Sequence, residues 1–440
     1  MDLTENVAGW LLGQLELLPA SLLHDKLFQV PRRLFDQLIG EREAAELEAL
    51  LLRSPTNGER TNVVLLPGVM GSLLSSVRGI SAMLWINPTV ILDGHVNLLD
   101  LDATGTRDNA SDVQVMAVGI EKVFYLSLIL ALARETRLYE FPYDWRYSNL
   151  YSAEQLHLAL MRWSDASSSG SSSQRFVLVG HSMGGVVIRT YLALYPDEAA
   201  RLIQKVIMLA SPLQGAANAI ALFTGIAPTQ DVIEHLNPAN DMLRLISNFP
   251  SAYELLPPPQ SLYKPKRSYP ANWNLYDAKA WGLPQMHQHH LDAAVRHHQL
   301  LARSDPQVPM YQIAGCNLMT MTDIRLTAAD AASGFTPIYH QSGEEGGDDT
   351  VPLYSSWNQQ VKTYFVTEHH QHIPGNPLVR QAVLDLIHDR QPDLPGVPVA
   401  EPDSLVSKLN TSSLVQQVQE LRQRFEKGTF SRDDLARLFI

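Results

Sequence analysis

The chain is poor in cysteine and in positive charge. Its single cysteine, Cys316, cannot form an intramolecular disulfide, so nothing in the sequence requires an oxidising compartment. The 34 Lys and Arg residues are outnumbered by 46 Asp and Glu residues, for a formal net charge of −12. Because contacts to phosphate groups need clustered cations, we expect no nucleic-acid partner.

Long apolar runs are also absent. A membrane-spanning helix needs about 18 or more apolar residues, and the stretch 124–133, one of the longest here, is too short. The acidic start 1–5 has no basic region, so we expect no secretory signal. These absences predict a cytoplasmic protein. What the sequence does have is 440 residues with 45% hydrophobic and 18% charged residues, which is typical of a globular protein with a sizeable core.

The middle of the chain alternates between short apolar runs and helical stretches. The runs are continuously apolar and rich in β-branched residues, as expected for strands buried on both faces of a mostly parallel sheet. They cover 63–66, 138–141, 176–179, 206–209, 310–313 and 363–366. This alternation predicts an α/β domain over 61–392. The long insertion at about 216–306 is predicted to be a lid or cap.

Both ends of the chain are predicted to be helical extensions, over 1–60 and 400–440. Near the C-terminus, Ser431 and Asp434 resemble a capping box that would begin a last short helix at 435–440. We expect the C-terminal extension to pack on its own domain, with binding of a protein partner or oligomerisation as the alternative. The apolar stripe at 10–18 suits core packing, with peripheral contact to a membrane as the alternative.

The strongest chemical signal is the segment Gly180-His181-Ser182-Met183-Gly184-Gly185, which lies between a predicted strand and a predicted helix. A serine on such a sharp turn projects its hydroxyl above the sheet, and glycines two residues away leave room for the chain to fold back. The helix that follows directs its N-terminus at developing negative charge. We therefore predict that Ser182 is a nucleophile.

A serine nucleophile needs a base and an orienting carboxylate. With the serine on a strand-to-helix turn of an α/β sheet, the expected chain order is Ser, then Asp or Glu, then His. Asp348 follows two glycines and is favoured over Asp349, because the glycines allow its carboxylate to point inward. The base is one of the three histidines His369, His370 and His372, among which the residues alone do not decide. Backbone amides would hold the oxyanion: Val69, in the turn after the first strand, and Met183, directly after the nucleophile.

Four motifs in this order resemble the lecithin:cholesterol acyltransferase-like lipases, over about 61–390. They are Pro67-Gly68-Val69-Met70-Gly71-Ser72, Pro142-Tyr143-Asp144-Trp145-Arg146, Gly180 to Gly184 and Gly347-Asp348-Asp349-Thr350-Val351. The resemblance implies an α/β-hydrolase fold with Ser182, Asp348 and His370 as the triad; His370 is selected because the segment 370–377 fits the family's His-to-Asn-Pro frame. It also implies Val69 and Met183 as the oxyanion pair, and it gives Asp144-Trp145-Arg146 a place in the wall of the site.

The resemblance implies a serine esterase or lipase that hydrolyses lipid-like esters, such as phospholipids or glycerides, without a cofactor. Two alternatives are a lipid O-acyltransferase that uses an alcohol acceptor and a non-catalytic α/β-hydrolase-like binding protein. Five histidines in the insertion could suggest zinc, namely His287, His289, His290, His297 and His298. Because they show no firm ligand spacing, we expect a solvated amphipathic helix there and no metal.

Overall fold

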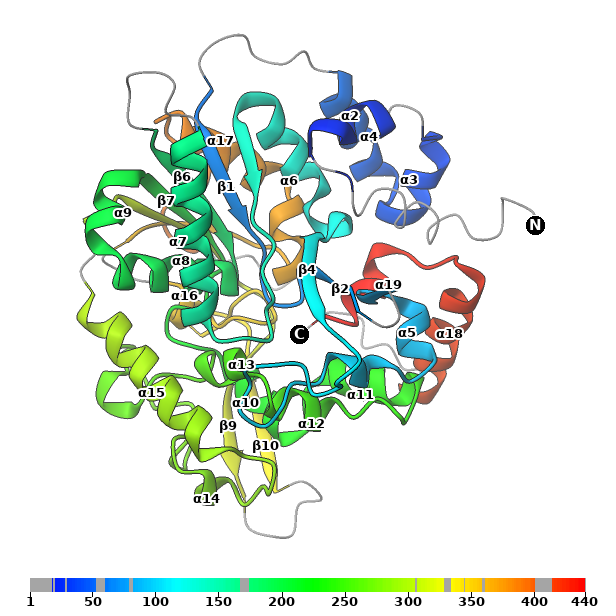
Figure 1. Cartoon of the computed structure of the whole chain (residues 1–440), viewed down its shortest axis with the longest axis vertical. Helices are drawn as coiled ribbons and strands as arrows, with labels where there is room; N and C mark the ends of the chain where they lie inside the picture. The colour runs from blue at the N-terminus through cyan, green and yellow to red at the C-terminus, as the bar shows by residue number, and fades with distance from the viewer. Residues whose placement is uncertain are drawn as a thin grey trace.

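The computed structural model describes residues 18, 20–27, 30–52, 60–78, 82–166, 174–304, 307–327, 334–343, 345–357, 361–399 and 414–439. At its centre is a six-stranded sheet with the order β11-β8-β7-β6-β1-β5 (Figure 1). The strands are β1 (Asn62–Leu66), β5 (Arg137–Glu140), β6 (Phe176–His181), β7 (Ile203–Leu209), β8 (Met310–Gly315) and β11 (Lys362–Val366). All five neighbouring pairs are parallel.

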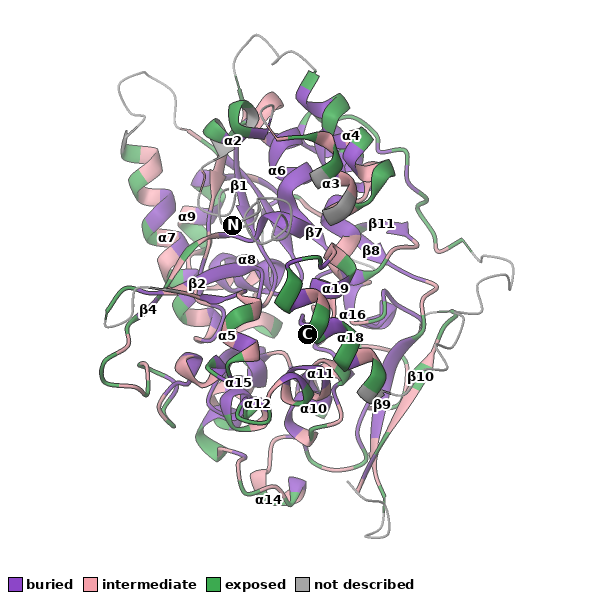
Figure 2. Ribbon diagram, turned by 90° about the vertical axis from the view of Figure 1, so that its right-hand side faces the viewer, coloured by how far each residue is buried: buried purple, intermediate pink, exposed green. Residues whose placement is uncertain are grey.

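The six predicted strands therefore all lie in one sheet, and the predicted α/β class is confirmed. Every residue of β1 and β6 is buried, which explains why these strands are continuously apolar rather than alternating. Figure 2 shows the buried strands of this sheet in purple, enclosed by more exposed helices. A parallel sheet needs crossover connections that cover it, and helices supply them here.

Helices α7 (Asn149–Ala166), α8 (Met183–Leu194) and α9 (Pro196–Leu202) pack together in front of the sheet in Figure 1. Helices α6 (Lys122–Glu135) and α17 (Pro377–Ile387) form a second pair of helices in contact with each other, and α6 also contacts β5. Helix α6 is buried along nearly its whole length, and the Glu121 side chain caps its start by accepting hydrogen bonds from Val123 N–H and Phe124 N–H at 2.5 and 2.9 Å.

The insertion at 216–306 lies beyond the carboxyl ends of the strands, in the lower part of Figure 1. Its elements are α10 (Ala217–Thr224), α11 (Pro228–Leu236), α12 (Met242–Ser247), α13 (Pro250–Glu254), η2 (Gln260–Leu262), α14 (Ala278–Trp281) and α15 (Gln288–Arg303). Beside α10 stands an antiparallel hairpin, β9 (Thr320–Leu326) and β10 (Phe335–His340). The sequence analysis did not predict this hairpin.

A second small sheet has the strand order β3-β2-β4 and follows the first strand of the domain. Its strands are β2 (Ser72–Ser76), β3 (Ala82–Trp85) and β4 (Val115–Ile120), and it adjoins the short helices α5 (Pro88–Leu92) and η1 (Val96–Leu99). Two further short helices follow strands or loops of the main sheet, α16 (Leu353–Ser356) and η3 (His370–Gly375).

The N-terminal extension contains α2 (Ala20–Leu27), α3 (Arg32–Ile39) and α4 (Glu41–Leu52), and α2 and α4 pack on α6. The predicted stripe at 10–18 lies outside the described residues except for Leu18, and so does the Ser/Gly stretch 167–173. The C-terminal extension contains α18 (Leu414–Lys427) and α19 (Arg432–Ala436), drawn in red in Figure 1. The capping box of Ser431 and Asp434 is present, but its helix ends at Ala436 instead of spanning 435–440.

The two helical extensions meet. Arg432 of α19 forms a largely buried ion pair with Glu43 of α4. Helix α18 contacts α5 and α11, which brings the C-terminal segment between the small sheet and the insertion. Within the described part of the chain, no helix has both the length and the apolar character required to cross a membrane.

Candidate active site

Ser182 lies at the turn between β6 and α8, with φ of 52° and ψ of −125°. A positive φ is strained for a serine, and such strain is a known feature of a nucleophile on a strand-to-helix turn. The neighbouring glycines are required by close packing: a Cβ on Gly184 would lie 2.5 Å from the carbonyl oxygen of Pro67, and one on Gly180 would lie 2.7 Å from the backbone nitrogen of Gly185. The glycine spacing of this motif therefore has the steric cause expected from the sequence.

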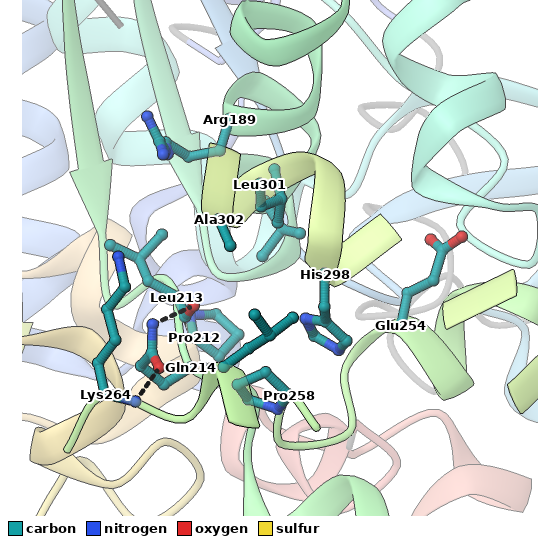
Figure 3. A pocket seen from close by; sticks show the side chains of 12 residues that line it. Arg189, Pro212, Leu213, Gln214, Glu254, Pro258, Lys264, His298, Leu301 and Ala302 are labelled. Carbon is teal, nitrogen blue, oxygen red and sulfur yellow. Dashed lines mark hydrogen bonds between the residues drawn. The ribbon is translucent and has the colours of Figure 1, made fainter. Parts of the chain in front are cut away.

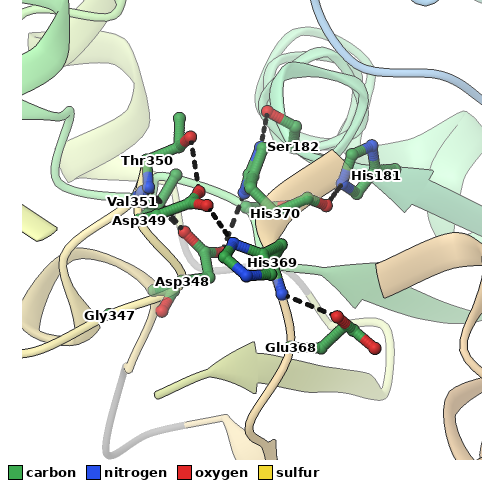
Figure 4. Close-up of polar contacts among 12 residues, drawn as sticks. His181, Ser182, Gly347, Asp348, Asp349, Thr350, Val351, Glu368, His369 and His370 are labelled. Atoms are coloured by element: carbon green, nitrogen blue, oxygen red, sulfur yellow. Dashed lines mark hydrogen bonds and ion pairs between the residues drawn. The ribbon is translucent and has the colours of Figure 1, made fainter. Parts of the chain in front are cut away.

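A row of hydrogen bonds joins Ser182, His370 and Asp348 (Figure 4). His370 Nε2 is 2.9 Å from Ser182 Oγ, and His370 Nδ1 is 2.8 Å from Asp348 Oδ2. Because a carboxylate only accepts, Nδ1 carries the proton and Nε2 is free to accept the proton of the serine hydroxyl. The three residues come from β6 and two distant loops, and they are 6%, 3% and 1% exposed.

Backbone amides fix the Asp348 carboxylate. Its Oδ1 accepts hydrogen bonds from Val351 N–H at 2.7 Å and Thr350 N–H at 3.2 Å, and its own carbonyl accepts one from His370 N–H at 2.9 Å. Burial lowers the pKa of His370, but the charge and hydrogen bond of Asp348 outweigh burial and raise that pKa above its ordinary value of 6.5. The electrostatics therefore stabilise the imidazolium that a general base would become.

The alternative residues form a separate pair. Asp349, with φ of 75°, turns its carboxylate to the Nδ1 of the more exposed His369. His372 stacks on Phe124, with ring centroids 6.0 Å apart. No hydrogen bond between described residues joins Asp349, His369 or His372 to Ser182. The structure therefore brings together the three residues selected as the triad and leaves the alternatives outside.

The turn after β1 lies directly against Ser182, since a Cβ on Gly68 would be 2.8 Å from the Cβ of Ser182. Gly68 and Val69 line a cavity together with Ser182 and His370. Among the hydrogen bonds between described residues, none uses the N–H of Val69 or of Met183. Both amides proposed for the oxyanion are thus available at this end of the sheet.

A buried hydrogen-bonded bridge, which the sequence analysis missed, links this turn to His370. Tyr125 Oη accepts from Gly68 N–H at 2.9 Å and lies 2.7 Å from His181 Nδ1, while His181 Nε2 lies 3.1 Å from the His370 carbonyl oxygen. The carbonyl can only accept, so Nε2 carries the proton and Tyr125 donates to Nδ1. Burial lowers the pKa of His181 well below 6.5, which keeps the ring neutral. Position 181 was visible in the serine motif, but nothing in the sequence around Tyr125 indicated this contact.

The Tyr-Asp-Trp-Arg motif holds the same turn at both ends. Tyr143 Oη donates to the carbonyl of Pro67 at 2.9 Å, and Trp145 Nε1 donates to that of Ser72 at 3.2 Å. Arg146 is fully buried and forms ion pairs with Asp144 at 2.6 Å and with a second aspartate, at position 108, at 2.9 Å. The motif therefore holds both ends of the turn after β1, and the ion pairs of Arg146 hold the motif itself in place.

The cavity at Ser182 is small, with a volume of about 20 Å³. A larger cavity, of about 60 Å³, lies between α8, α15 and the loop after β7 (Figure 3). Its lining includes Arg189, Gln214 and Lys264 but no residue of the triad. Ser182 and His370 line only the smaller of these two cavities.

The five histidines of the insertion lie on α15 or directly before it. Among the described residues, no group of three or more His, Cys, Asp or Glu side chains is placed to hold a metal ion. The expectation of a solvated helix is wrong for three of the five: His290, His297 and His298 are buried on α15. Burial lowers the pKa of His297 to about 4 and that of His298 to about 3, because neutral imidazoles pack against the rest of the protein here.

Comparison with known proteins places this geometry in a family context. The family model described as lecithin:cholesterol acyltransferase matches residues 130–384, a range that contains Ser182, Asp348 and His370. In Arabidopsis thaliana, phospholipase A(1) LCAT3 is 27% identical over 132 residues, which are 29% of each chain. Lecithin-cholesterol acyltransferase-like 4 of the same plant is 25% identical over 251 residues, 47% of this chain and 46% of the relative. The chain thus spans less than half the length of these relatives.

Among solved structures, a chain of the Tle4–Tli4 complex is similar with a TM-score of 0.50 and 14% identity. The similarity covers 74% of this chain and 98% of that one, and it concerns the fold.

Proposed function

Because the chain belongs to the lecithin:cholesterol acyltransferase family, we propose that it is a serine esterase or lipase that hydrolyses carboxylic esters of lipid-like substrates. The observation that carries this proposal is the hydrogen-bonded row from Asp348 through His370 to Ser182 at the carboxyl end of β6. A binding protein without catalysis would not need a strained serine in contact with a buried, carboxylate-oriented imidazole.

In the proposed mechanism, Ser182 Oγ attacks the ester carbonyl carbon as its proton passes to His370 Nε2. Asp348 holds the ring in the required tautomer and stabilises its positive charge. The N–H groups of Val69 and Met183 donate to the developing oxyanion. His370 then returns the proton to the leaving alkoxide, and the acyl group remains on Ser182.

The second half of the reaction releases the acyl group. His370 removes a proton from water, the resulting hydroxide attacks the acyl carbonyl, and Ser182 leaves with a proton supplied by His370. An alcohol in place of water would give a new ester, which is the acyltransferase alternative. Ser182 is only 6% exposed, and limited access of water to its hydroxyl favours this alternative.

The test compares wild type with Ser182→Ala on p-nitrophenyl esters of several chain lengths. Ser127→Ala is a matched control, because Ser127 is also buried and its hydroxyl has no partner among the described residues. We expect turnover to fall to background in Ser182→Ala alone. Equal turnover in all three proteins would refute the enzyme proposal.

Substrate class needs a second experiment. Incubation with phospholipid or glyceride vesicles, with and without a long-chain alcohol, identifies the released product. Free fatty acid in both cases supports hydrolysis, and a new ester formed only with the alcohol supports acyl transfer. The cytoplasmic location, peripheral contact with a membrane, and partner binding through the terminal helices stay predictions.

A further inference from the structure

The C-terminal segment reaches the cavity at Ser182. Phe439, which follows α19, lines this cavity together with Val69 and Phe124, and its side chain is 7% exposed. The proposed reaction gives no role to the C-terminal segment that carries Phe439. This segment also lies outside the range matched by the family model. Its position beside Ser182 and His370 is therefore an additional feature of this protein's site.

Several contacts hold Phe439 in place. Its ring meets that of Phe124 edge to face, with centroids 4.9 Å apart, and meets Trp85 in the same way at 5.9 Å. Its backbone carbonyl accepts a hydrogen bond from Thr229 Oγ1, in α11, at 2.7 Å. Aromatic pairs with this geometry are favourable beyond the area that they bury. Contacts from α6, from the small sheet and from the insertion thus fix the position of Phe439.

The segment before Phe439 is anchored independently of the cavity. Arg432 pairs with Glu43 in α4, and Arg424 pairs with Asp434 at 2.8 Å. Farther from the site, Phe430 is buried against Phe425, with ring centroids 5.3 Å apart. The position of Phe439 therefore follows from the packing of the whole C-terminal segment, which makes it a fixed part of the wall.

We propose that Phe439 determines acyl-chain specificity by closing the apolar side of the cavity at Ser182. This inference rests on the proposed ester hydrolysis. The reasoning is steric: the cavity is small, its apolar side is formed by Phe124 and Phe439, and an acyl chain attached at Ser182 extends until it meets a side chain. A shorter side chain at 439 lets longer chains bind, and a larger one excludes them.

The experiment measures kcat/KM for p-nitrophenyl esters from C2 to C16 in wild type, Phe439→Ala, Phe439→Trp and Phe430→Ala. Since a single methylene in an apolar pocket changes specificity by about tenfold or more, we expect the C12-to-C4 ratio to rise at least tenfold in Phe439→Ala. The same ratio falls in Phe439→Trp. Phe430→Ala is the matched control: it removes a buried ring of the same segment outside the cavity, so it lowers stability and leaves the ratio at the wild-type value.

A second measurement does not depend on turnover. The affinity for saturated fatty acids of C4 to C16 is determined by calorimetry in a Ser182→Ala background, with and without Phe439→Ala. Tighter binding of the longer acids in the double variant supports the inference. Identical chain-length profiles in both backgrounds overturn it, even where Ser182-dependent turnover shows that the proposed hydrolysis is correct. Loss of Ser182 dependence with an altered binding profile would refute the hydrolysis alone.

Discussion

Replacing Tyr125 by phenylalanine tests the buried bridge beside the active site. The change removes one oxygen that accepts from Gly68 N–H at 2.9 Å and donates to His181 Nδ1 at 2.7 Å. Both partners are buried and lose their hydrogen bond. An unpaired buried polar group costs about 1–3 kcal/mol, so with two such groups we expect the free energy of unfolding to fall by about 2–6 kcal/mol.

The same change releases one support of the turn that carries Val69. Loss of an entire oxyanion donor lowers kcat by about 10²–10³-fold. The turn keeps other supports, including the Gly71 N–H to Gly68 carbonyl bond at 3.1 Å and the Trp85 Nε1 bond to the Met70 carbonyl at 2.8 Å. We therefore expect a smaller loss in kcat, about tenfold to a hundredfold, with little change in KM.

The matched control is Tyr191→Phe. Tyr191 is a fully buried tyrosine whose hydroxyl has no partner among the described residues, so removal of its oxygen breaks no known bond. Urea denaturation gives the stabilities, and steady-state kinetics on a short-chain ester gives kcat and KM. Similar results for the two variants would show that the bridge through Tyr125 supports neither the fold nor the site.

Three further predictions follow from buried charges and imidazoles. Asp348→Asn removes the carboxylate that raises the pKa of His370. We expect kcat to fall by about 10⁴-fold in steady-state assays, and the acid limb of the residual pH–rate profile to move to lower pH. An acid limb at the wild-type pH would contradict the assignment of Asp348. Burial lowers the pKa of His297 to about 4, so below pH 6.5 this group binds fewer protons in the folded state than in the unfolded state. The free energy of unfolding therefore falls as the pH decreases from 6.5 to 4, and this group accounts for about 3 kcal/mol of that fall. Thermal unfolding measured across that range checks the sign, and His297→Gln should flatten the slope. Arg146→Met leaves two largely buried carboxylates without their cation, and we expect a loss of about 3 kcal/mol in urea denaturation. A stability equal to wild type would show that this cluster is not a structural anchor.

Local sequence was sufficient for the main sheet. Each of the six predicted strands lies in it. Strands β1 and β6 are continuously apolar because they are buried on both faces, whereas the edge strand β5 is only partly buried. Helix α6 spans 122–135 and contains the apolar stretch 124–133, and Glu121 caps its start. The small sheet and the β9–β10 hairpin were not predicted. Strands β4 and β10 are only partly buried, and the mostly buried β2 and β9 contain Ser, Thr, Asp or Arg and so lack a continuous apolar pattern.

The histidines of α15 show the limit of such patterns. The histidine spacing led us to expect a solvated helix, yet His297 is buried and its Nε2 lies 2.8 Å from Thr190 Oγ1 of α8. The sequence contains both residues but no sign that they meet. Burial of a polar side chain depends on a partner, and that partner can come from any other element.

By itself the sequence determined which segments of the chain form the main strands and where the serine turn lies. It also determined which loops carry a carboxylate and an imidazole. Each of these features depends on residues that are neighbours in the chain. Only the tertiary structure decided that Tyr125 and His181 connect the turn after β1 to His370, and that Phe439 enters the cavity at Ser182. The physical reason is that such contacts depend on how helix α6 and the segment that follows α19 pack against other elements. Packing joins residues that are far apart in the chain, and no local periodicity records which of them will touch.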